Sequence, residues 1–410
     1  MKIGFFTDTY FPQVSGVSTS IRTLKLELES RGHEVYIFTT TDPNVRELEP
    51  RIIRMPSIPF ISFKERRLIV RGMLYAYYVA KDLELDIIHT HTEFGLGLLG
   101  KQVAKQLDIP CVHTYHTMYE DYLHYIANGK LIRPVHVKQF SKLYTASLSG
   151  IICPSKRVVD KLEEYDIDIP KYIIPTGIDI SQFTAVSEEK KQAIREKYAI
   201  DKNEIFLLSV SRISYEKNIQ TILDGLPDVV AKVPQIKLLI VGDGPYKKDL
   251  EKQVAKLELE DYVIFSGEIP NEEISPIYQA ADIFVSASDS ETQGLTYTEA
   301  MAAKTKVVAK GNDYLNDLFD DLSLGLTYKE NQDFSSALVA YLKEEHPVNE
   351  ALIKRKLYEI SSEAFGERVA AFYEETRAYY ELLENDQKDI PINEPTSVDG
   401  FKKADEVTDE

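Results

Sequence analysis

The sequence has few of the residues that build disulfide frameworks or metal clusters. Its 410 residues include only two cysteines, Cys111 and Cys153, each in an apolar, strand-like setting. Two thiols form no disulfide framework, and neither stands in a metal-binding spacing, so we expect no metal site. No run approaches the roughly 18 apolar residues of a membrane span, and the short apolar start is not a signal peptide. We expect a reduced, cytoplasmic protein that meets membranes only from the surface.

Positive charge is scarce as well, and it is unevenly placed. The net charge of −18 argues against nucleic-acid binding, which needs a basic footprint. Residues 1–180 carry 22 Lys and Arg against 21 Asp and Glu, whereas the remaining 230 residues carry 26 against 45. This difference predicts two domains that face different partners.

Short apolar runs alternate with longer amphipathic stretches along most of the chain. The runs, each typical of a buried parallel strand, are 2–6, 35–39, 52–54, 87–89, 111–115, 151–153, 172–174, 204–210, 236–241, 262–265, 283–286 and 306–309. Helices are expected between them, at 18–30, 69–83, 96–107, 135–147, 187–201, 219–233, 246–257, 274–279 and 296–303. The pattern predicts an α/β protein with two Rossmann-like, doubly wound parallel sheets.

The chain divides into four predicted parts. Residues 1–178 form one Rossmann-like domain, residues 179–350 form the second, residues 351–384 form terminal helices that pack back toward the first domain, and the charged residues 385–410 form a disordered tail. Two such domains facing each other create a cleft at the carboxyl ends of both sheets, where open α/β sheets bind ligands.

A glycine lies in the loop after the first predicted strand. Gly16 lets the backbone approach a ligand, and the following helix offers free amides to an anion, with Ser18 and Thr19 as candidate caps. The loop is not G-x-G-x-x-G, which argues against a nicotinamide cofactor. An ordinary βα turn has the same composition, so this loop alone does not decide between ligand site and structural turn.

Two cations stand in the loop after the strand at 204–210. Arg212 and Lys217 suit a diphosphate, the arginine as a forked donor and the lysine as a point charge. Gly242 begins a Gly-Asp-Gly-Pro turn after the next strand, at the same edge of the cleft, although such a turn often only starts a helix.

Two glutamates eight residues apart follow the strand at 283–286. On one helix they would point about 80° apart, so they converge better if Glu291 lies on the loop and Glu299 inside a helix that Gly294 opens. The free amides at the start of that helix, including that of Leu295, would then hold a phosphate.

Taken in order, the Gly loop, Arg-x4-Lys, the Gly-Asp-Gly-Pro turn and Glu-x7-Glu resemble the retaining group 1 (family 4) glycosyltransferases over roughly residues 1–380. The resemblance implies a GT-B fold, a nucleotide-sugar donor, retention at the anomeric carbon, and chemistry without metal or cofactor. It places Gly16, Arg212 and Lys217 at the donor phosphates, Glu291 at the sugar hydroxyls and Glu299 at the ribose, with Gly242, Gly294 and Leu295 also expected to bind the donor. Position 293 is Gln where many members carry Phe, which bears on the identity of the sugar.

Within this family, residues 8–17 and 115–122 resemble the 1,2-diacylglycerol glucosyltransferases. These transfer glucose from UDP-glucose to diacylglycerol and make the monoglucosyl lipid of envelope anchors. The resemblance places His116 near the donor sugar as a catalytic residue, whereas His113 is expected in the core.

Basic and apolar residues mix in the first half in a way that fits an anionic membrane surface. One such segment spans residues 58–71, and another, residues 122–157, contains six cations and no acidic residue: Lys130, Arg133, Lys138, Lys142, Lys156 and Arg157. Each nearby cation contributes about 1 kcal/mol to such docking. A solvated helix face has the same composition, so we state docking at the inner face of the cell membrane as an expectation.

Three alternatives remain open on the sequence. The same donor chemistry serves a soluble or polysaccharide acceptor, a sugar-nucleotide epimerase shares the two-domain architecture, and a nucleotide-sugar sensor would use the site without turnover. The Asp166-x-Asp168 pair imitates a metal-binding motif of another fold and is interpreted as chance.

Overall fold

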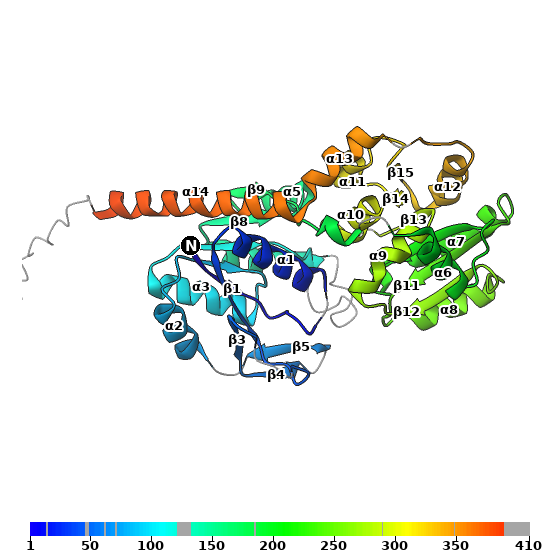
Figure 1. Ribbon diagram of the computed structural model, residues 1–410. Helices are drawn as coiled ribbons and strands as arrows, with labels where there is room; N and C mark the ends of the chain where they lie inside the picture. The colour runs from blue at the N-terminus through cyan, green and yellow to red at the C-terminus, as the bar shows by residue number, and fades with distance from the viewer. Residues whose placement is uncertain are drawn as a thin grey trace, which may run out of the picture.

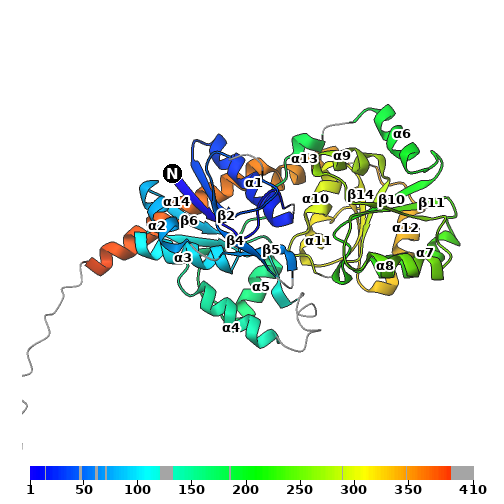
Figure 2. The ribbon, with the colours of Figure 1, turned by 90° about the horizontal axis from the view of Figure 1, so that it is seen from below.

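Two parallel sheets, side by side in Figures 1 and 2, organise the chain. The computed structural model describes residues 1–13, 15–45, 49–60, 63–69, 72–120, 133–183, 186–288, 290–347 and 349–388. Parts of two predicted membrane segments, residues 61, 62, 70 and 71 and residues 122–132, lie outside the described residues, as do residues 389–410 of the predicted tail. The predicted α/β architecture of two Rossmann-like domains is confirmed.

In the first sheet, the described strands run parallel in the order β3-β2-β1-β6-β7-β8-β9. They are β1 (Lys2–Phe6), β2 (Glu34–Thr40), β3 (Ile52–Met55), β6 (Ile87–Thr90), β7 (Cys111–Thr114), β8 (Gly150–Cys153) and β9 (Lys171–Ile173). Helix α1 (Gly16–Ser30) covers one face, and α2 (Met73–Asp82), α3 (Gly95–Leu107), α4 (Pro134–Thr145) and α5 (Lys156–Glu164) pack over the other. Because both faces are covered, these strands are apolar throughout rather than alternating.

The second sheet has the order β12-β11-β10-β13-β14-β15. Its strands are β10 (Ile205–Val210), β11 (Ile236–Val241), β12 (Val263–Gly267), β13 (Ile283–Ser286), β14 (Lys306–Lys310) and β15 (Gly325–Tyr328). One face packs against α9 (Asn271–Ala280), α10 (Leu295–Ala302), α11 (Asp313–Leu318) and α13 (Glu350–Glu359), and the other against α7 (Ile219–Val230), α8 (Lys247–Lys256) and α12 (Phe334–Leu342). In each sheet the strand order reverses beside the first strand, which is where such sheets bind ligands.

The chain crosses between the domains twice, and the two crossings bond to each other. The amide of Ile178 donates to the Ile360 carbonyl at 2.9 Å, and the amide of Ser362 donates to the Ile178 carbonyl at 2.8 Å. Helix α14 (Ser362–Lys388) then runs back along α1 and buries Phe365, Val369 and Tyr373 against the first sheet (Figure 1). The crossings therefore form a paired hinge, and α14 joins the end of the chain to the first domain.

Several elements differ from the sequence prediction. The hairpin β4 (Ser57–Phe60) and β5 (Phe63–Ile69), strand β15, and helices α5, α11 and α12 were not predicted. These elements are short or mostly polar, so their local pattern is weak, and α5 buries only Val158 and Leu162. Helix α2 begins at Met73 rather than at residue 69 because β5 occupies the preceding residues. The domain limits at residues 178 and 350 stay predictions, whereas α14 extends four residues past the expected helix end at 384.

Candidate active site

The loops at the carboxyl ends of β10 and β13 bring two predicted site residues into direct contact. Lys217 ends the short 3-10 helix η4 (Tyr215–Lys217), and Glu291 lies on the loop between β13 and α10. The Lys217 Nζ and Glu291 Oε1 atoms are 2.6 Å apart, and each side chain keeps only 16% of its surface exposed. Burial opposes ionisation of Glu291, but its hydrogen bond to the Lys217 ammonium and the positive charges of Lys217 and Arg157 outweigh it and lower the carboxyl pKa below its ordinary value. An ionised carboxylate therefore lies against a cation where β10 and β13 end.

Gly294 opens α10 as predicted, for a reason visible in the backbone. Its φ is +79°, and a Cβ at this position would lie 2.5 Å from the ring of Tyr297. Only glycine adopts this conformation here without strain. Helix α10 then begins at Leu295, so its first amides are free to bind an anion beside Glu291.

Glu299 lies inside α10, as expected, and it is held by a tyrosine from α9. The Tyr278 hydroxyl donates to Glu299 Oε2 at 2.9 Å. Burial raises the pKa of Glu299 above its ordinary value, even though this hydrogen bond acts in the opposite direction. The two glutamates thus occupy different electrostatic environments, and only Glu291 is paired with a lysine. The ribose role of Glu299 stays a prediction.

The Gly-Asp-Gly-Pro turn supports the loop that carries Arg212. Gly242 has a φ of +134°, and a Cβ on it would lie 2.0 Å from the Ser211 carbonyl oxygen. The amide of Ile213 donates to the Asp243 carbonyl at 2.8 Å. This close packing explains why position 242 is a glycine, which the sequence did not reveal. The contact of Gly242 with the donor stays a prediction.

The donor loop also contacts the first domain, next to His116. The Thr292 hydroxyl donates to the His116 carbonyl at 3.2 Å, and the Arg157 guanidinium donates to the Glu291 carbonyl at 2.6 Å. Ser155 donates to the Thr292 carbonyl as well. His116, which follows β7, therefore lies beside the predicted site. More than 170 residues separate it from Thr292 in the sequence, so no local pattern indicates this contact. His113 lies fully buried, as expected, with its Nε2 atom 3.2 Å from Glu93 Oε1.

Gln293 faces the hinge. Its Oε1 atom accepts from the Thr176 amide at 2.7 Å, and its Nε2 atom donates to the Thr176 carbonyl at 2.9 Å. The Thr176 hydroxyl lies 3.3 Å from that of Ser20 on α1. The amide of this buried glutamine bonds to the crossing between the domains. It therefore does not contact the sugar directly.

The glycine loop of the first domain is capped differently from the prediction. Helix α1 begins at Gly16, and its cap is Ser15, whose hydroxyl accepts from the Ser18 amide at 3.2 Å. Ser18 supplies the reciprocal bond, since its hydroxyl accepts from the Ser15 amide at 2.7 Å. The N-terminal cap is therefore Ser15, and of the two predicted caps Ser18 takes part in the capping box, whereas Thr19 was placed wrongly. No atom lies within 4 Å of a Cβ built on Gly16, which leaves room for a ligand there.

Most of the cations in the described part of segment 122–157 have acidic or backbone partners. Lys138 and Lys142 contact Asp166 at 2.8 and 3.2 Å, and Lys156 contacts Asp160 at 2.6 Å. Arg157 belongs to the interface between the domains. Membrane docking by this segment stays a prediction: Arg157 is used between the domains, and Lys138, Lys142 and Lys156 share their charge with carboxylates. Asp166, interpreted as a chance motif, is thus an ion-pair partner.

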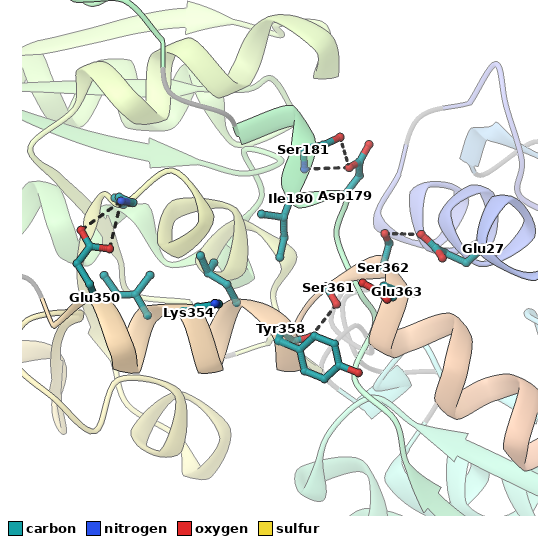
Figure 3. Close-up of a pocket in the computed structure, with 13 residues that line it drawn as sticks. Glu27, Asp179, Ile180, Ser181, Glu350, Lys354, Tyr358, Ser361, Ser362 and Glu363 are labelled. Carbon is teal, nitrogen blue, oxygen red and sulfur yellow. Dashed lines mark hydrogen bonds and ion pairs between the residues drawn. The ribbon is translucent and has the colours of Figure 1, made fainter. Parts of the chain in front are cut away.

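A cavity of about 690 Å³ lies behind the hinge, away from the donor loop. Figure 3 shows residues of α1, the 3-10 helix η3 (Ile180–Phe183), α13 and α14 around it, among them Glu27, Asp179, Lys354 and Glu363. This cavity contains none of the predicted site residues, so the chemistry is assigned from the side-chain cluster at the ends of β10 and β13 and not from this cavity. Among the described residues, no three His, Cys, Asp or Glu side chains could jointly hold a metal ion.

Sequence reasoning missed His91 and Tyr278, and it assigned Arg157 to the membrane segment rather than to the contact between the domains. His91 Nδ1 lies 3.1 Å from His116 Nε2. The His89-Thr-His91 repeat at the end of a predicted strand was a usable signal. The other two contacts join distant segments and leave no local pattern.

Comparison with known proteins agrees with this geometry. Residues 14–182 match the family described as Glycosyltransferase Family 4, and residues 190–357 match Glycosyl transferases group 1. The chain is 50% identical to the alpha-monoglucosyldiacylglycerol synthase of Streptococcus pneumoniae, across 98% of this chain and 91% of that one. It is 34% identical to the alpha-monoglucosyldiacylglycerol synthase of Acholeplasma laidlawii, across 95% and 99%. The crystal structure of HepE from Anabaena in complex with UDP superposes with a TM-score of 0.74 at 17% identity, covering 92% of this chain and all of that one.

Proposed function

The chain belongs to the group 1 (family 4) glycosyltransferases, and on this basis we propose that it transfers glucose from UDP-glucose to 1,2-diacylglycerol with retention, making alpha-monoglucosyldiacylglycerol. The observation that carries the proposal is the 50% identity, over nearly the whole chain, to a synthase of that name. Identity at this level extends through both domains, so it includes the acceptor side as well as the donor side. A soluble or polysaccharide acceptor and an epimerase reaction are not favoured.

On the donor side, the proposal uses the residues gathered at β10 and β13. Arg212 and Lys217 would bind the diphosphate, together with the free amides at the start of α10. In transfer, the bond between the anomeric carbon and the diphosphate oxygen breaks, and a bond to the acceptor oxygen forms on the same face. The departing phosphate oxygen would take the acceptor proton, and the cations would stabilise the charge that develops on it. The UDP and UDP-glucose complexes of the similar HepE structure support a donor of this chemistry.

Lys217 would exchange partners when the donor binds. In the structure its ammonium pairs with Glu291 at 2.6 Å. A diphosphate beside it would draw the ammonium away and leave Glu291 to accept hydrogen bonds from sugar hydroxyls. The ion pair therefore keeps Glu291 ionised and holds both side chains in place before a donor binds. His116 and Gly16 would complete the site from the first domain.

On the acceptor side, the helices that cover one face of the first sheet expose several large apolar side chains. Helix α2 exposes more than half of Met73, Leu74, Tyr75 and Tyr78, and the neighbouring helices expose Leu98, Val135 and Leu143. Figure 2 shows α3 between α2 and α4, and the rings of Phe94 and Phe140 stack at 5.2 Å to join the last two. We call these seven exposed residues the apolar face. Apolar patches of this kind on a water-facing helix are typical of interfacial docking.

The apolar face refines the expected membrane contact. Lys81 and Lys105, at the ends of α2 and α3, are exposed beside it. We propose that this face rests on an anionic bilayer and brings the donor site to diacylglycerol. No helix in the described part of the chain is long and apolar enough to cross a membrane.

The proposal is tested by two measurements. In the first, the protein is incubated with diacylglycerol micelles and a panel of nucleotide sugars, and products are identified by mass. A hexosyl lipid formed from UDP-glucose is expected. Turnover of UDP-glucose without an acceptor, or transfer only to soluble sugars, would refute the proposal.

The second measurement addresses the membrane. The L74E/Y78E variant should float with phosphatidylglycerol vesicles about 10- to 100-fold less well, because the two substitutions together remove roughly 1.5–3 kcal/mol of apolar burial. Its turnover on micellar diacylglycerol should be retained. The matched control is L322E, which changes a residue of similar exposure on the second domain, where Leu322 is 48% exposed. Equal flotation of both variants would refute the assignment of the apolar face.

A further inference from the structure

A second histidine lies directly behind His116. His91 follows β6, is 2% exposed, and packs its ring against those of Phe5 and His89 at centroid distances of 4.8 and 4.0 Å. Its Nδ1 atom lies 3.1 Å from the Nε2 atom of His116. The two side chains therefore share one hydrogen bond, and its direction decides which nitrogen of His116 carries the hydrogen.

Both rings are neutral. Burial and the neighbouring histidines lower the pKa of His91 well below its ordinary value, and burial together with His113 lowers the pKa of His116 to about 3. A neutral imidazole has one N–H donor and one acceptor nitrogen. Two arrangements are then compatible with the 3.1 Å contact: His91 donates from Nδ1, or His116 donates from Nε2.

The other nitrogen of His91 decides between them. His91 Nε2 is buried and has no hydrogen-bond partner among the residues that the structure describes. If His116 donated, His91 would have to carry its own hydrogen on Nε2, as a buried N–H without an acceptor. Orphaned buried N–H groups are rarer than unpaired acceptors in folded proteins. The favoured arrangement is therefore an Nδ1–H of His91 that donates to Nε2 of His116.

We propose that His91 is a positioning residue that fixes His116 in the tautomer with its hydrogen on Nδ1, so that His116 offers an N–H donor, and not a lone pair, to the donor sugar. The inference rests on the proposed function, because it takes His116 as the residue that meets the sugar. The position of His116 beside the donor loop, through its carbonyl and the Thr292 hydroxyl, supports that role. A hydrogen bond donated to a sugar hydroxyl would orient the sugar for transfer.

Two substitutions that differ by one methylene test the proposal. In His91→Asn the amide nitrogen occupies nearly the position of Nδ1 and can still donate to His116, whereas in His91→Gln it reaches the position of Nε2 and cannot. We expect kcat within about threefold of the wild type for His91→Asn and a loss of about 10- to 100-fold for His91→Gln, as one hydrogen bond to the sugar is misdirected. UDP affinity, measured by calorimetry, should stay the same in both, because the diphosphate is bound elsewhere. Equal losses in both variants, in step with their melting temperatures, would overturn the proposal.

A direct measurement keeps the proposal testable even if these variants fold poorly. Nitrogen-15 histidine spectra of the wild-type protein report the tautomer of each ring, and His116→Asn assigns its signals. We expect both His91 and His116 to carry hydrogen on Nδ1. Hydrogen on Nε2 of His116 would overturn the proposal. Failure of the wild-type chain to glucosylate diacylglycerol would refute the proposed function alone, since the tautomer is measured without turnover.

Discussion

Removing the Lys217 ammonium should destabilise the second domain, and a second substitution at its partner Glu291 should restore most of the lost stability. At 2.6 Å and an effective dielectric constant of about 20, the attraction between Lys217 and Glu291 amounts to about 6 kcal/mol before desolvation is subtracted. Breaking a buried pair costs about 3–5 kcal/mol, because the remaining charge is left uncompensated. Since each side chain retains 16% exposure, we expect the lower end of that range, about 3 kcal/mol, for Lys217→Met.

Scanning calorimetry near pH 7.5 measures this effect. For a domain of this size, about 3 kcal/mol corresponds to a melting temperature lower by about 6–12 °C. The double variant K217M/E291Q removes the stranded charge and should recover most of the loss, while turnover stays reduced by orders of magnitude in both variants. UDP-glucose transfer is measured beside each scan, at a temperature where all the variants are folded.

The pH dependence supplies a second check with a definite sign. In the wild type the pKa of Glu291 is lowered from 4.5, so its stabilising contribution is present above that pH and is lost as the pH falls through the folded-state pKa. In Lys217→Met, burial favours the protonated form of Glu291. Acidification therefore removes the free-energy cost of the buried, unpaired carboxylate. The stability gap between the two proteins should therefore begin to narrow above pH 4.5, where the Glu291 carboxyl of the variant is protonated, and should narrow further below pH 4.5, where the wild type loses its ion pair. A double variant as unstable as Lys217→Met, or a gap that does not change with pH, would refute the charge-pair reasoning.

Three further predictions concern the same loop and helix. Gln293→Leu leaves the buried amide and carbonyl of Thr176 unpaired, so the free energy of unfolding measured with urea should fall by about 2 kcal/mol. Unchanged stability would mean that these two hydrogen bonds contribute nothing. The pKa of Glu299 is raised, so its charged form disfavours folding above that pKa, and Glu299→Gln should have a higher melting temperature at neutral pH. The same variant loses a charged acceptor for the ribose, so its UDP affinity, measured by calorimetry, should fall about tenfold. A higher affinity would contradict the ribose role. Gly294→Ala places a Cβ 2.5 Å from a tyrosine ring at φ +79°, so thermal scans should show a loss of about 1–3 kcal/mol, and a neutral effect would contradict the backbone argument.

The sequence alone determined the architecture and the order of the site elements. Buried parallel strands are continuous apolar runs, and their periodicity is local, so most strand positions were predicted to within one or two residues. The placement of Glu291 on a loop and Glu299 in a helix opened by Gly294 followed from helix geometry and from the backbone freedom of glycine. The order of these motifs was enough to identify the family resemblance, which the comparisons confirm.

Only the tertiary structure decided which of these residues touch. Lys217 and Glu291 are 74 positions apart, and Arg157 and Glu291 are 134 apart, so no local pattern predicts their pairing. The same reason hid the Gln293 contact at the hinge and the neutral histidine pair behind His116. The tertiary structure also shows that the apolar residues of α2 divide between two sides of the helix. Ala76 and Ala80 are buried, whereas Met73, Leu74, Tyr75 and Tyr78 are exposed. Periodicity and capping act within a few residues, whereas pairing and burial depend on how distant segments pack, and that packing fixed the site.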